Sequence, residues 1–234
     1  MPITPEMLAR ARQHRRAESE QLLAQMYAPV FRMTRALIGG SSPAEHAVMR
    51  IMRRALAHVE KWRDDTDAQR WFLHFTTLEV RRAIDAAPVD PSHDLLLLHG
   101  PRDNIAYVAF IRALRALPVQ QLEAIVLHHA AHLNDRYVAI AMDCSTAAAE
   151  AHLKAAEGTL KAIAGPALPD RLAELSTAYR SLGPDAEIMP REVRAVVARD
   201  LRNRRAKKLA KVAIILGVIA LIAGIAWWWR TQSQ

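Results

Sequence analysis

Three histidines, His128, His129 and His132, have the types and spacing that come closest to a metal site in this sequence. His128 and His132 are four residues apart, so one face of a helix could direct both imidazoles toward a metal ion. The zinc-protease pattern requires a glutamate directly after the first histidine, and this sequence has His129 there. Because no third strong ligand is evident, we expect no metal centre and interpret the histidines as the solvated end of a helix.

The single cysteine, Cys144, and the neighbouring Ser145 are the next candidates for chemistry. One cysteine allows neither an intrachain disulfide framework nor a zinc site made of thiolates. We interpret Cys144 as a packed thiol and Ser145 as the N-cap of a following helix, with Thr146 as the other candidate for the cap. The sequence shows no glycine-rich phosphate loop, nucleophile elbow or pair of catalytic carboxylates, so we expect neither an enzyme nor a bound cofactor.

The positive charge of the chain is concentrated near its C-terminus. The formal net charge is +8. Residues 191–211 hold nine Lys or Arg against two acids, and Arg230 adds one positive charge, so residues 1–190 sum to zero. The charge therefore indicates a local basic cluster and does not indicate a basic nucleic-acid-binding body. The candidates in this cluster for contact with anionic lipid are Arg204, Arg205, Lys207, Lys208 and Lys211.

An uncharged stretch of 18 residues, 212–229, follows the basic cluster directly. At about 1.5 Å per residue, an α-helix of this length spans roughly 27 Å, close to the hydrocarbon thickness of a bilayer. The alternative is a buried core helix, but a core helix of a small domain normally keeps a polar face. The stretch is therefore predicted to be a transmembrane helix.

The flanks of this stretch predict its orientation. Because the basic cluster precedes it, the positive-inside bias places residues 1–211 in the cytoplasm. Trp227, Trp228 and Trp229 would then form an aromatic belt at the outer interface, followed by a short outer tail, 230–234. The N-terminus has no apolar stretch of the kind that a signal peptide requires.

Four small residues recur along the predicted membrane helix, at Ala213, Gly217, Ala220 and Gly224. Their spacings of four, three and four place them on one helix face, where a second helix can approach closely. The alternative is that glycine and alanine are simply common in membrane helices. The stripe is a candidate surface for self-association.

The elements before the membrane stretch follow helical periodicity, and glycine is scarce, at 8 of 234 residues. The pattern predicts an all-α protein with two small helical domains. The first is 1–86, and 87–104, with three prolines, is predicted to be a linker that carries a short apolar plug. The second is 105–165, where two helices around the turn 142–145 have the outline of a helix-turn-helix. Residues 166–211 are predicted to be a tether that carries one amphipathic helix near 169–182 and ends in a basic helix.

Two sets of residues occur in the order of a known family. The first set is Tyr27, Pro29, Val30, Phe31, Leu37, Ala44, Glu45, Val48, Arg53, Ala55, Trp62 and Trp71. The second set is Leu117, Pro118, Leu133, Val138, Ala139, Cys144, Ser145 and Leu153. On these positions residues 22–83 resemble region 2, and residues 113–163 resemble region 4, of RNA polymerase sigma factors of the sigma-70 family, extracytoplasmic-function group. Together the two regions cover roughly 110 of the 234 residues.

This resemblance implies an all-α fold and a role in transcription initiation. In the family, region 2 binds core RNA polymerase and reads the upstream edge of the melted promoter, and region 4 reads a more distal promoter element in the major groove. The resemblance gives as candidate polymerase-binding residues Glu45, His46, Met49, Arg50 and Arg53. It gives as candidate DNA-binding residues Arg81, Arg82, Thr146, Glu150, His152 and Lys154.

The chain departs from the family at several of these positions. His46, Met49 and Arg50 stand where the family typically carries an acid, a glutamine and an acid, so the predicted polymerase surface has gained the opposite charge. Glu150 stands where the family usually has a lysine, and the helix 146–157 sums to −1. Phosphates and guanine edges select for Arg and Lys, so this helix is poorly suited to a polyanion.

Two functions are consistent with these observations. The first is a membrane-anchored, sigma-factor-like regulator of transcription initiation in the bacterial inner membrane, with a cytoplasmic N-terminus. The alternative is a sigma-like membrane interaction module that has lost promoter and polymerase binding. The resemblance to sigma factors in two regions favours the first function. The charge changes at His46, Arg50 and Glu150 favour the second. A membrane anti-sigma protein is a weaker third hypothesis, because the sequence lacks the zinc-type His and Cys motif.

Overall fold

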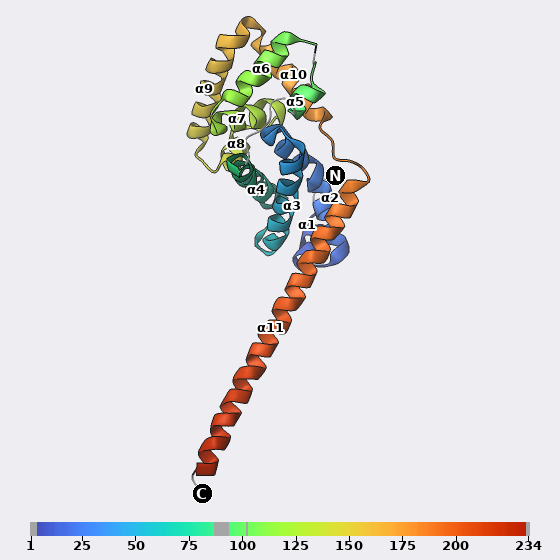
Figure 1. The fold of residues 1–234 in the computed structure, drawn as a ribbon, viewed down its shortest axis with the longest axis vertical. Coiled ribbons are helices and arrows are strands. Elements are labelled where there is room, and N and C mark those ends of the chain that lie inside the picture. The colour runs from blue at the N-terminus through green and yellow to red at the C-terminus, as the bar shows by residue number, and fades with distance from the viewer. Residues whose placement is uncertain (1–3, 87–93, 102, 233–234) are drawn as a thin grey trace.

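The computed structural model describes residues 4–86, 94–101 and 103–232, without the side chains of residues 41–43, 85–86, 225–227 and 229–232. Every regular element in these residues is helical (Figure 1), which confirms the predicted all-α class. The α-helices are α1 (Pro5–Arg12), α2 (Arg16–Ile38), α3 (Ser41–Ala57), α4 (Asp65–Ala86), α5 (Leu95–His99), α6 (Ile105–Ala116), α7 (Val119–Ile125), α8 (Asp135–Met142), α9 (Thr146–Ala164), α10 (Leu168–Ser181) and α11 (Ile188–Gln232). Short helical turns are η1 (Val59–Lys61), η3 (Val126–Ala130), which is π-helical, and η4 (Gly165–Ala167).

The first four α-helices pack around one apolar core. Helices α2, α3 and α4 contact one another, and α1 lies against α2. Trp62 and Phe72 are buried in this core with their ring centroids 5.5 Å apart. The base of α11 completes it with Val193, Val196 and Val197, whose i, i+3, i+4 spacing places them on one helix face. The C-terminal helix is therefore part of the N-terminal bundle.

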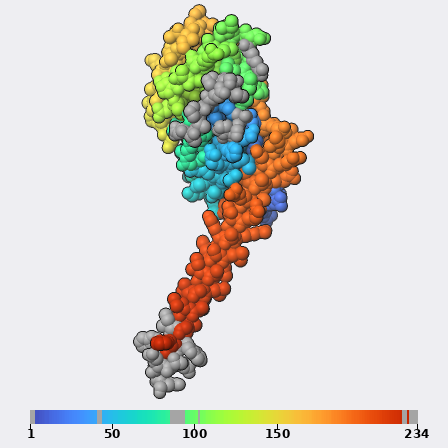
Figure 2. Space-filling model, viewed as in Figure 1, coloured from blue at the N-terminus to red at the C-terminus, as the bar shows by residue number. Residues whose placement is uncertain are grey.

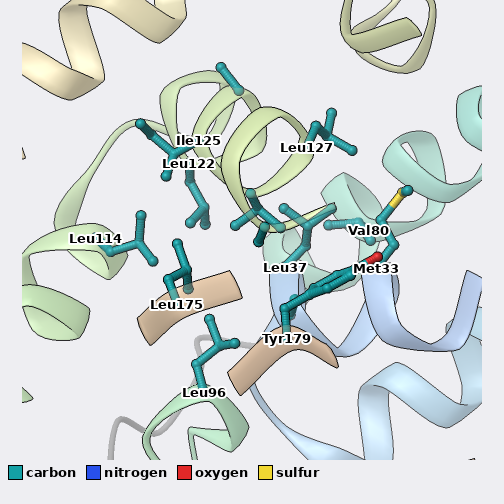
Figure 3. Packing of buried hydrophobic residues seen from close by; sticks show 14 of the residues in the cluster. Met33, Leu37, Val80, Leu96, Leu114, Leu122, Ile125, Leu127, Leu175 and Tyr179 are labelled. Carbon is teal, nitrogen blue, oxygen red and sulfur yellow. The ribbon is translucent and has the colours of Figure 1, made fainter. Parts of the chain in front are cut away.

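A second apolar core joins the other side of this bundle to the rest of the body. It contains residues of α2, α3 and α4 together with residues of α5 to α10. Figure 3 shows Leu37 of α2 and Val80 of α4 in the same cluster as Tyr179 of α10. Because this core is continuous, the segments 1–86 and 105–165 pack directly against each other.

Helix α5, in the described part of the predicted linker, packs against the body. Leu95 and Leu96 are buried, as expected of the short apolar plug. Asp94 precedes α5 and its carboxylate accepts hydrogen bonds from Arg115 Nε at 2.5 Å and Nη2 at 3.0 Å. The remainder of the predicted linker, 87–93, lies outside the described residues.

Much of the predicted tether is packed against the body. Helix α10 confirms the expected amphipathic helix and buries Leu175, Ala178 and Tyr179 in the second core. These residues recur at helical spacing, so α10 presents one apolar face to its neighbours. Since the base of α11 enters the first core, residues 183–187 are the stretch between two packed helices.

Helix α11 continues from Ile188 to Gln232 and leaves the body as a single rod (Figures 1 and 2). Its 45 residues correspond to roughly 68 Å. Large apolar side chains on the projecting part are exposed, including Leu216 and Leu221. Among the residues whose side chains are described, no helix is long and apolar enough to cross a membrane. The predicted span 212–229 includes side chains at 225–227 and 229 that lie outside this set.

Candidate functional site

Helices α8 and α9 are joined by a tight turn, residues 143–145. α8 ends at Met142, and Asp143, with φ +57°, reverses the chain in the left-handed conformation. The Ser145 hydroxyl accepts a hydrogen bond from Ala148 N at 3.2 Å, which confirms the predicted cap of α9. Burial raises the pKa of the Cys144 thiol in the same turn, so the group stays protonated at neutral pH.

The outer face of α9 is exposed and carries little charge. Thr146, Glu150 and Lys154 are exposed on its first three turns, and His152 is half-buried. Glu150 and Lys154 carry opposite charges, so this face has a formal charge of zero. The other exposed residues of 146–158 are all small: Ala147, Ala151, Ala155 and Gly158.

Arg81, a candidate for DNA contact, links α4 to the second half of the body. Its Nε and Nη2 donate to Oε1 and Oε2 of Glu123 at 2.8 and 2.6 Å, and Nη2 also donates to the Met142 carbonyl at 3.0 Å. The Glu123 side chain is 0% exposed. Burial raises the pKa of Glu123 against the opposing effect of Arg81, while the hydrogen bond raises the pKa of Arg81. The bidentate geometry is typical of an arginine–carboxylate ion pair. The Arg81 guanidinium is therefore paired with Glu123 inside the body.

The same face of α4 binds the end of α8 directly. The Thr77 hydroxyl donates a hydrogen bond to the carbonyl of Ala141. Together with the Arg81 contacts, this bond holds the end of α8 on the N-terminal bundle.

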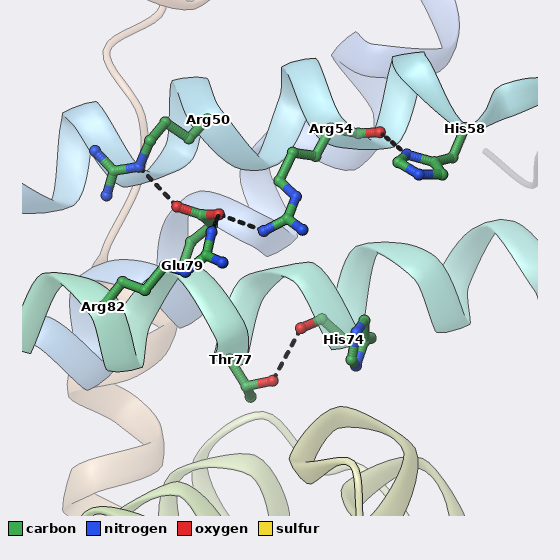
Figure 4. A network of polar contacts seen from close by, with 7 residues as sticks. All are labelled: Arg50, Arg54, His58, His74, Thr77, Glu79 and Arg82. Atoms are coloured by element: carbon green, nitrogen blue, oxygen red, sulfur yellow. Dashed lines mark hydrogen bonds and ion pairs between the residues drawn. The ribbon is translucent and has the colours of Figure 1, made fainter.

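A second buried carboxylate, Glu79 of α4, is surrounded by three arginines (Figure 4). Arg50 Nε donates to Oε2 at 2.7 Å, and Arg54 Nη1 and Arg82 Nη1 donate to Oε1 at 2.7 and 2.9 Å. Burial of Glu79, which is 1% exposed, raises its pKa, but the hydrogen bonds from Arg50 and Arg54 outweigh burial and hold the pKa below its usual range. Arg50 and Arg82 therefore share an internal partner, and three guanidiniums on one carboxylate leave a formal surplus of two positive charges.

The base of α11 lies beside the α3 residues predicted to bind polymerase. α11 contacts both α2 and α3. Met49 packs against the core that α11 enters. Burial lowers the pKa of Arg53, and the nearby guanidinium of Arg199 lowers it further. The Tyr27 hydroxyl of α2 donates to the Glu192 carboxylate of α11.

The other predicted polymerase residues have different surroundings. Glu45 accepts a hydrogen bond from Arg35 Nη2 at 2.7 Å. His46 is exposed. The structure thus brings all five candidates together on α3, but it places two beside α11, two in ion pairs within the body and one at the surface.

The three neighbouring histidines have separate partners. His128 Nδ1 lies 3.3 Å from the Asp135 carboxylate, and His129 Nε2 lies 2.8 Å from Glu157 Oε1. His132 Nε2 lies 2.8 Å from the Ser176 hydroxyl. Within the described residues, no group of three His, Cys, Asp or Glu side chains is placed to hold a metal ion.

The candidate lipid-binding residues lie where α11 leaves the body. Arg204 is tied to the body, because its Nε donates to Asp200 Oδ2 at 2.6 Å and its Nη1 donates to Glu60 Oε1 at 2.9 Å. The other four are exposed: Arg205, Lys207, Lys208 and Lys211.

The predicted self-association stripe is open to solvent. Ala213, Gly217, Ala220 and Gly224 are exposed on the projecting part of α11. A Cβ atom added at Gly217 or Gly224 would meet no atom within 4 Å. Trp228 is exposed, and the side chains of Trp227 and Trp229 lie outside the described residues.

The sequence reasoning missed the two buried carboxylates. Glu123 stands inside the apolar run 122–127, and Glu79 stands next to the buried Val80. A carboxylate at a helix position that faces the core requires a cationic partner. The inward positions of Glu79 and Glu123 could therefore have indicated the two ion pairs. The partners, Arg81 for Glu123 and Arg50 for Glu79, come from distant parts of the sequence.

Comparison of this chain with protein-family models, with curated proteins and with solved structures finds no match.

Proposed function

We propose that this chain is a membrane-anchored, sigma-factor-like regulator of transcription initiation whose cytoplasmic body binds core RNA polymerase and promoter DNA. The observation that supports this function best is the helix-turn-helix α8–α9, in which the outer face of α9 is exposed. An exposed second helix of this motif has the dimensions that the major groove admits. The three-helix bundle α2–α4 supplies the second surface, the polymerase-binding face of region 2, that the resemblance to sigma factors implies.

In this proposal the arrangement of the body is a resting state. The base of α11 lies beside Met49 and Arg53, so polymerase must displace it to reach that part of α3. Moving the helix-turn-helix away from α4 breaks the pair between Arg81 and Glu123. The C-terminal helix therefore restrains the body as well as anchoring it.

The experiment is retention of core RNA polymerase by the full chain in detergent micelles. His46 is exposed and stands where the family carries an acid, so its replacement leaves the core of the body intact. His46→Asp is expected to strengthen retention, and His46→Lys to weaken it, because the polymerase surface that it meets is basic in the family. Absence of retention by the wild-type chain, by both variants and by Val196→Asp, which removes the base of α11 from the first core, would contradict the proposal.

Anchoring in the bacterial inner membrane is a further part of the proposal. It is supported by the 18 uncharged residues of 212–229, by the basic residues before them and by the continuous course of α11. A reporter that is active only in the cytoplasm should work when it is fused before Arg191. A reporter active only outside should work after Gln234, and the reverse pattern would contradict the orientation.

A second function, a sigma-like membrane interaction module without promoter or polymerase binding, is favoured by a different observation. The outer face of α9 consists of small residues around Glu150 and Lys154, and the candidate arginines Arg50 and Arg81 are held in internal ion pairs. For such a module, His46→Asp is expected to bring no retention of polymerase. The same experiment therefore separates the two functions.

A further inference from the structure

A basic pocket of about 470 Å³ lies where α11 leaves the body. One wall is α11, and the other is formed by the turn between α1 and α2 and by η1, which lie next to the exit of α11 in Figure 1. Arg204, Lys207, Lys208 and Lys211 line it at spacings i, i+3, i+4 and i+7, so they share one face of α11. Arg205 adds a fifth positive charge at the edge of this face.

The opposite wall is built from the body and carries the single acid that lines the pocket. Glu60 Oε1 lies 2.6 Å from His14 Nε2 and accepts a hydrogen bond from Arg204 Nη1 at 2.9 Å. The hydrogen bond with His14, and then that with Arg204, hold the pKa of Glu60 below its usual range. Arg204 is also paired with Asp200. Glu60 is thus satisfied within the wall, and Gln13 offers an exposed amide beside it.

The remaining lysines and Arg205 of α11 are the uncompensated charges of the pocket. Lys207, Lys208 and Lys211 are exposed, and the structure gives them no ion pair within its described residues. A pocket with four surplus cations and an amide donor suits a phosphate group, which accepts several charge-assisted hydrogen bonds at once.

The position of the pocket along α11 favours a lipid over a soluble anion. Lys211 directly precedes the uncharged stretch that begins at Val212. At about 1.5 Å per residue, Lys207 to Lys211 lie roughly 2–8 Å before that stretch. The headgroup layer of a bilayer is roughly 5–7 Å thick on each side. When 212–229 is embedded, the pocket opens into the headgroup layer.

We propose that this pocket binds the phosphate of an anionic glycerophospholipid headgroup in the cytoplasmic leaflet. The proposal rests on the membrane anchor proposed above. It differs from general attraction of a basic helix to an anionic surface, because the wall that contains Gln13 and Glu60 belongs to the folded body. Lipid binding therefore fixes the body against the membrane at the base of α11.

The test uses the full chain in neutral detergent micelles, with native mass spectrometry to count bound lipid. Short-chain phosphatidylglycerol is the anionic probe, phosphatidylcholine is the neutral lipid, and inorganic phosphate is the free anion. One phosphatidylglycerol is expected to bind, with phosphatidylcholine and inorganic phosphate at least about tenfold weaker. Equal binding of inorganic phosphate would overturn the lipid assignment, and so would displacement of the lipid by an equal phosphate concentration of duplex DNA.

Matched pairs of variants distinguish lipid binding in the pocket from a general effect of net charge on lipid binding. Lys208→Gln in the pocket is compared with Arg202→Gln, which removes one positive charge from an exposed position of α11 outside the pocket. Gln13→Glu is compared with Gln21→Glu, which adds the same charge to the surface of α2. Each pocket variant is expected to weaken phosphatidylglycerol binding about fivefold, and each control less than twofold. If a pocket variant and its control weaken phosphatidylglycerol binding equally, the proposal of a lipid-binding pocket is overturned.

Different results would contradict the proposed membrane anchor and the proposed lipid pocket. Alkaline extraction of membranes tests the anchor alone. An extractable chain that still prefers phosphatidylglycerol, with the expected difference between Gln13→Glu and Gln21→Glu, supports the pocket and removes the anchor. A chain that resists extraction but shows no difference between those variants keeps the anchor and overturns the pocket.

Discussion

The Tyr27 hydroxyl donates a hydrogen bond to the carboxylate of Glu192, which lies 165 residues later in the chain. This contact joins α2 of the N-terminal bundle to the base of α11. Because α11 then continues past Val212, the projecting helix is continuous with a segment that packs in the core of the bundle that carries the predicted polymerase face. Three valines beneath the contact, Val193, Val196 and Val197, hold the same helix face in the core.

Release of the base of α11 is predicted for Val196→Asp. Val196 is 1% exposed, and burying an unpaired carboxylate there costs several kcal/mol, so the helix base should detach. Amides of residues 189–204 should lose protection from hydrogen exchange, and retention of core polymerase should rise. Ala195→Asp is the control, because Ala195 is an exposed neighbour. Unchanged protection in Val196→Asp would contradict the prediction.

Loss of the Arg81 guanidinium should destabilise the body strongly. Arg81→Ala leaves Glu123 buried without its cation, which costs about 3–5 kcal/mol. Arg82→Ala is the control, since Arg82 is 58% exposed and Glu79 keeps two other arginines, so the loss should be under about 1 kcal/mol. Urea unfolding of the full chain in micelles measures both.

The double variant Arg81→Met with Glu123→Leu tests the reason for this loss. It removes both charges together, so most of the stability lost in Arg81→Ala should return. If the double variant is as unstable as Arg81→Ala, packing around the pair, and not the unpaired charge, explains the loss.

The Glu79 cluster predicts a specific acid sensitivity. The pKa of Glu79 in the folded protein lies below its ordinary value of 4.5, so its contribution to stability is complete above that pH and is lost as pH falls through the lower folded pKa. Glu79→Gln should lose about 1–3 kcal/mol at neutral pH. Its stability should also fall less steeply below about pH 4.5 than that of the wild-type chain. Parallel curves in thermal unfolding from neutral to acid pH would contradict this account.

The sequence predicted features that depend on neighbouring residues. The Ser145 cap and the apolar face of α10 follow from local spacing, because helix ends and helix faces are set within a few residues. The Arg81 partner did not follow, since Glu123 is 42 residues away and periodicity does not tell which helices face each other. For the same reason the location of the α11 base against Tyr27 was not foreseen.

Internal pairing also changes how the polymerase surface must be tested. Arg50 stands where the family carries an acid, and Arg50→Glu would restore that charge. Its guanidinium, however, donates to the buried Glu79, so Arg50→Glu would place two carboxylates together and destabilise α3 and α4. His46 is exposed, and an acid restored there leaves the pair between Arg50 and Glu79 in place.

Association of two chains through the small-residue stripe of α11 is predicted to depend on its glycines. Gly217→Ile and Gly224→Ile add bulk on the exposed stripe, so each should weaken dimerisation in a membrane reporter. Ile222→Phe adds bulk on the opposite side of the helix and serves as the control. Equal dimerisation in all three variants would show that the stripe reflects composition alone.

DNA binding by α9 is the last test, and it separates the two proposed functions. Glu150 is exposed on the outer face of α9, where a carboxylate repels the phosphate backbone. The module without promoter binding therefore predicts that the wild-type chain binds DNA weakly at physiological salt. Glu150→Lys should raise the affinity about five- to tenfold at 0.1 M salt and steepen the salt dependence, because up to one more phosphate contact becomes available.

The control for this test is Glu187→Lys, which makes the same charge change at an exposed position remote from α9. Fluorescence anisotropy of labelled duplexes across a salt series measures affinity and slope for all three chains. A general gain of charge would raise affinity equally in both variants, whereas a contact made by α9 would appear only in Glu150→Lys. If the wild-type chain instead binds one sequence tightly and Glu150→Lys abolishes this binding, α9 reads DNA through an acidic side chain. That result would exclude the module without promoter binding and leave the regulator of initiation.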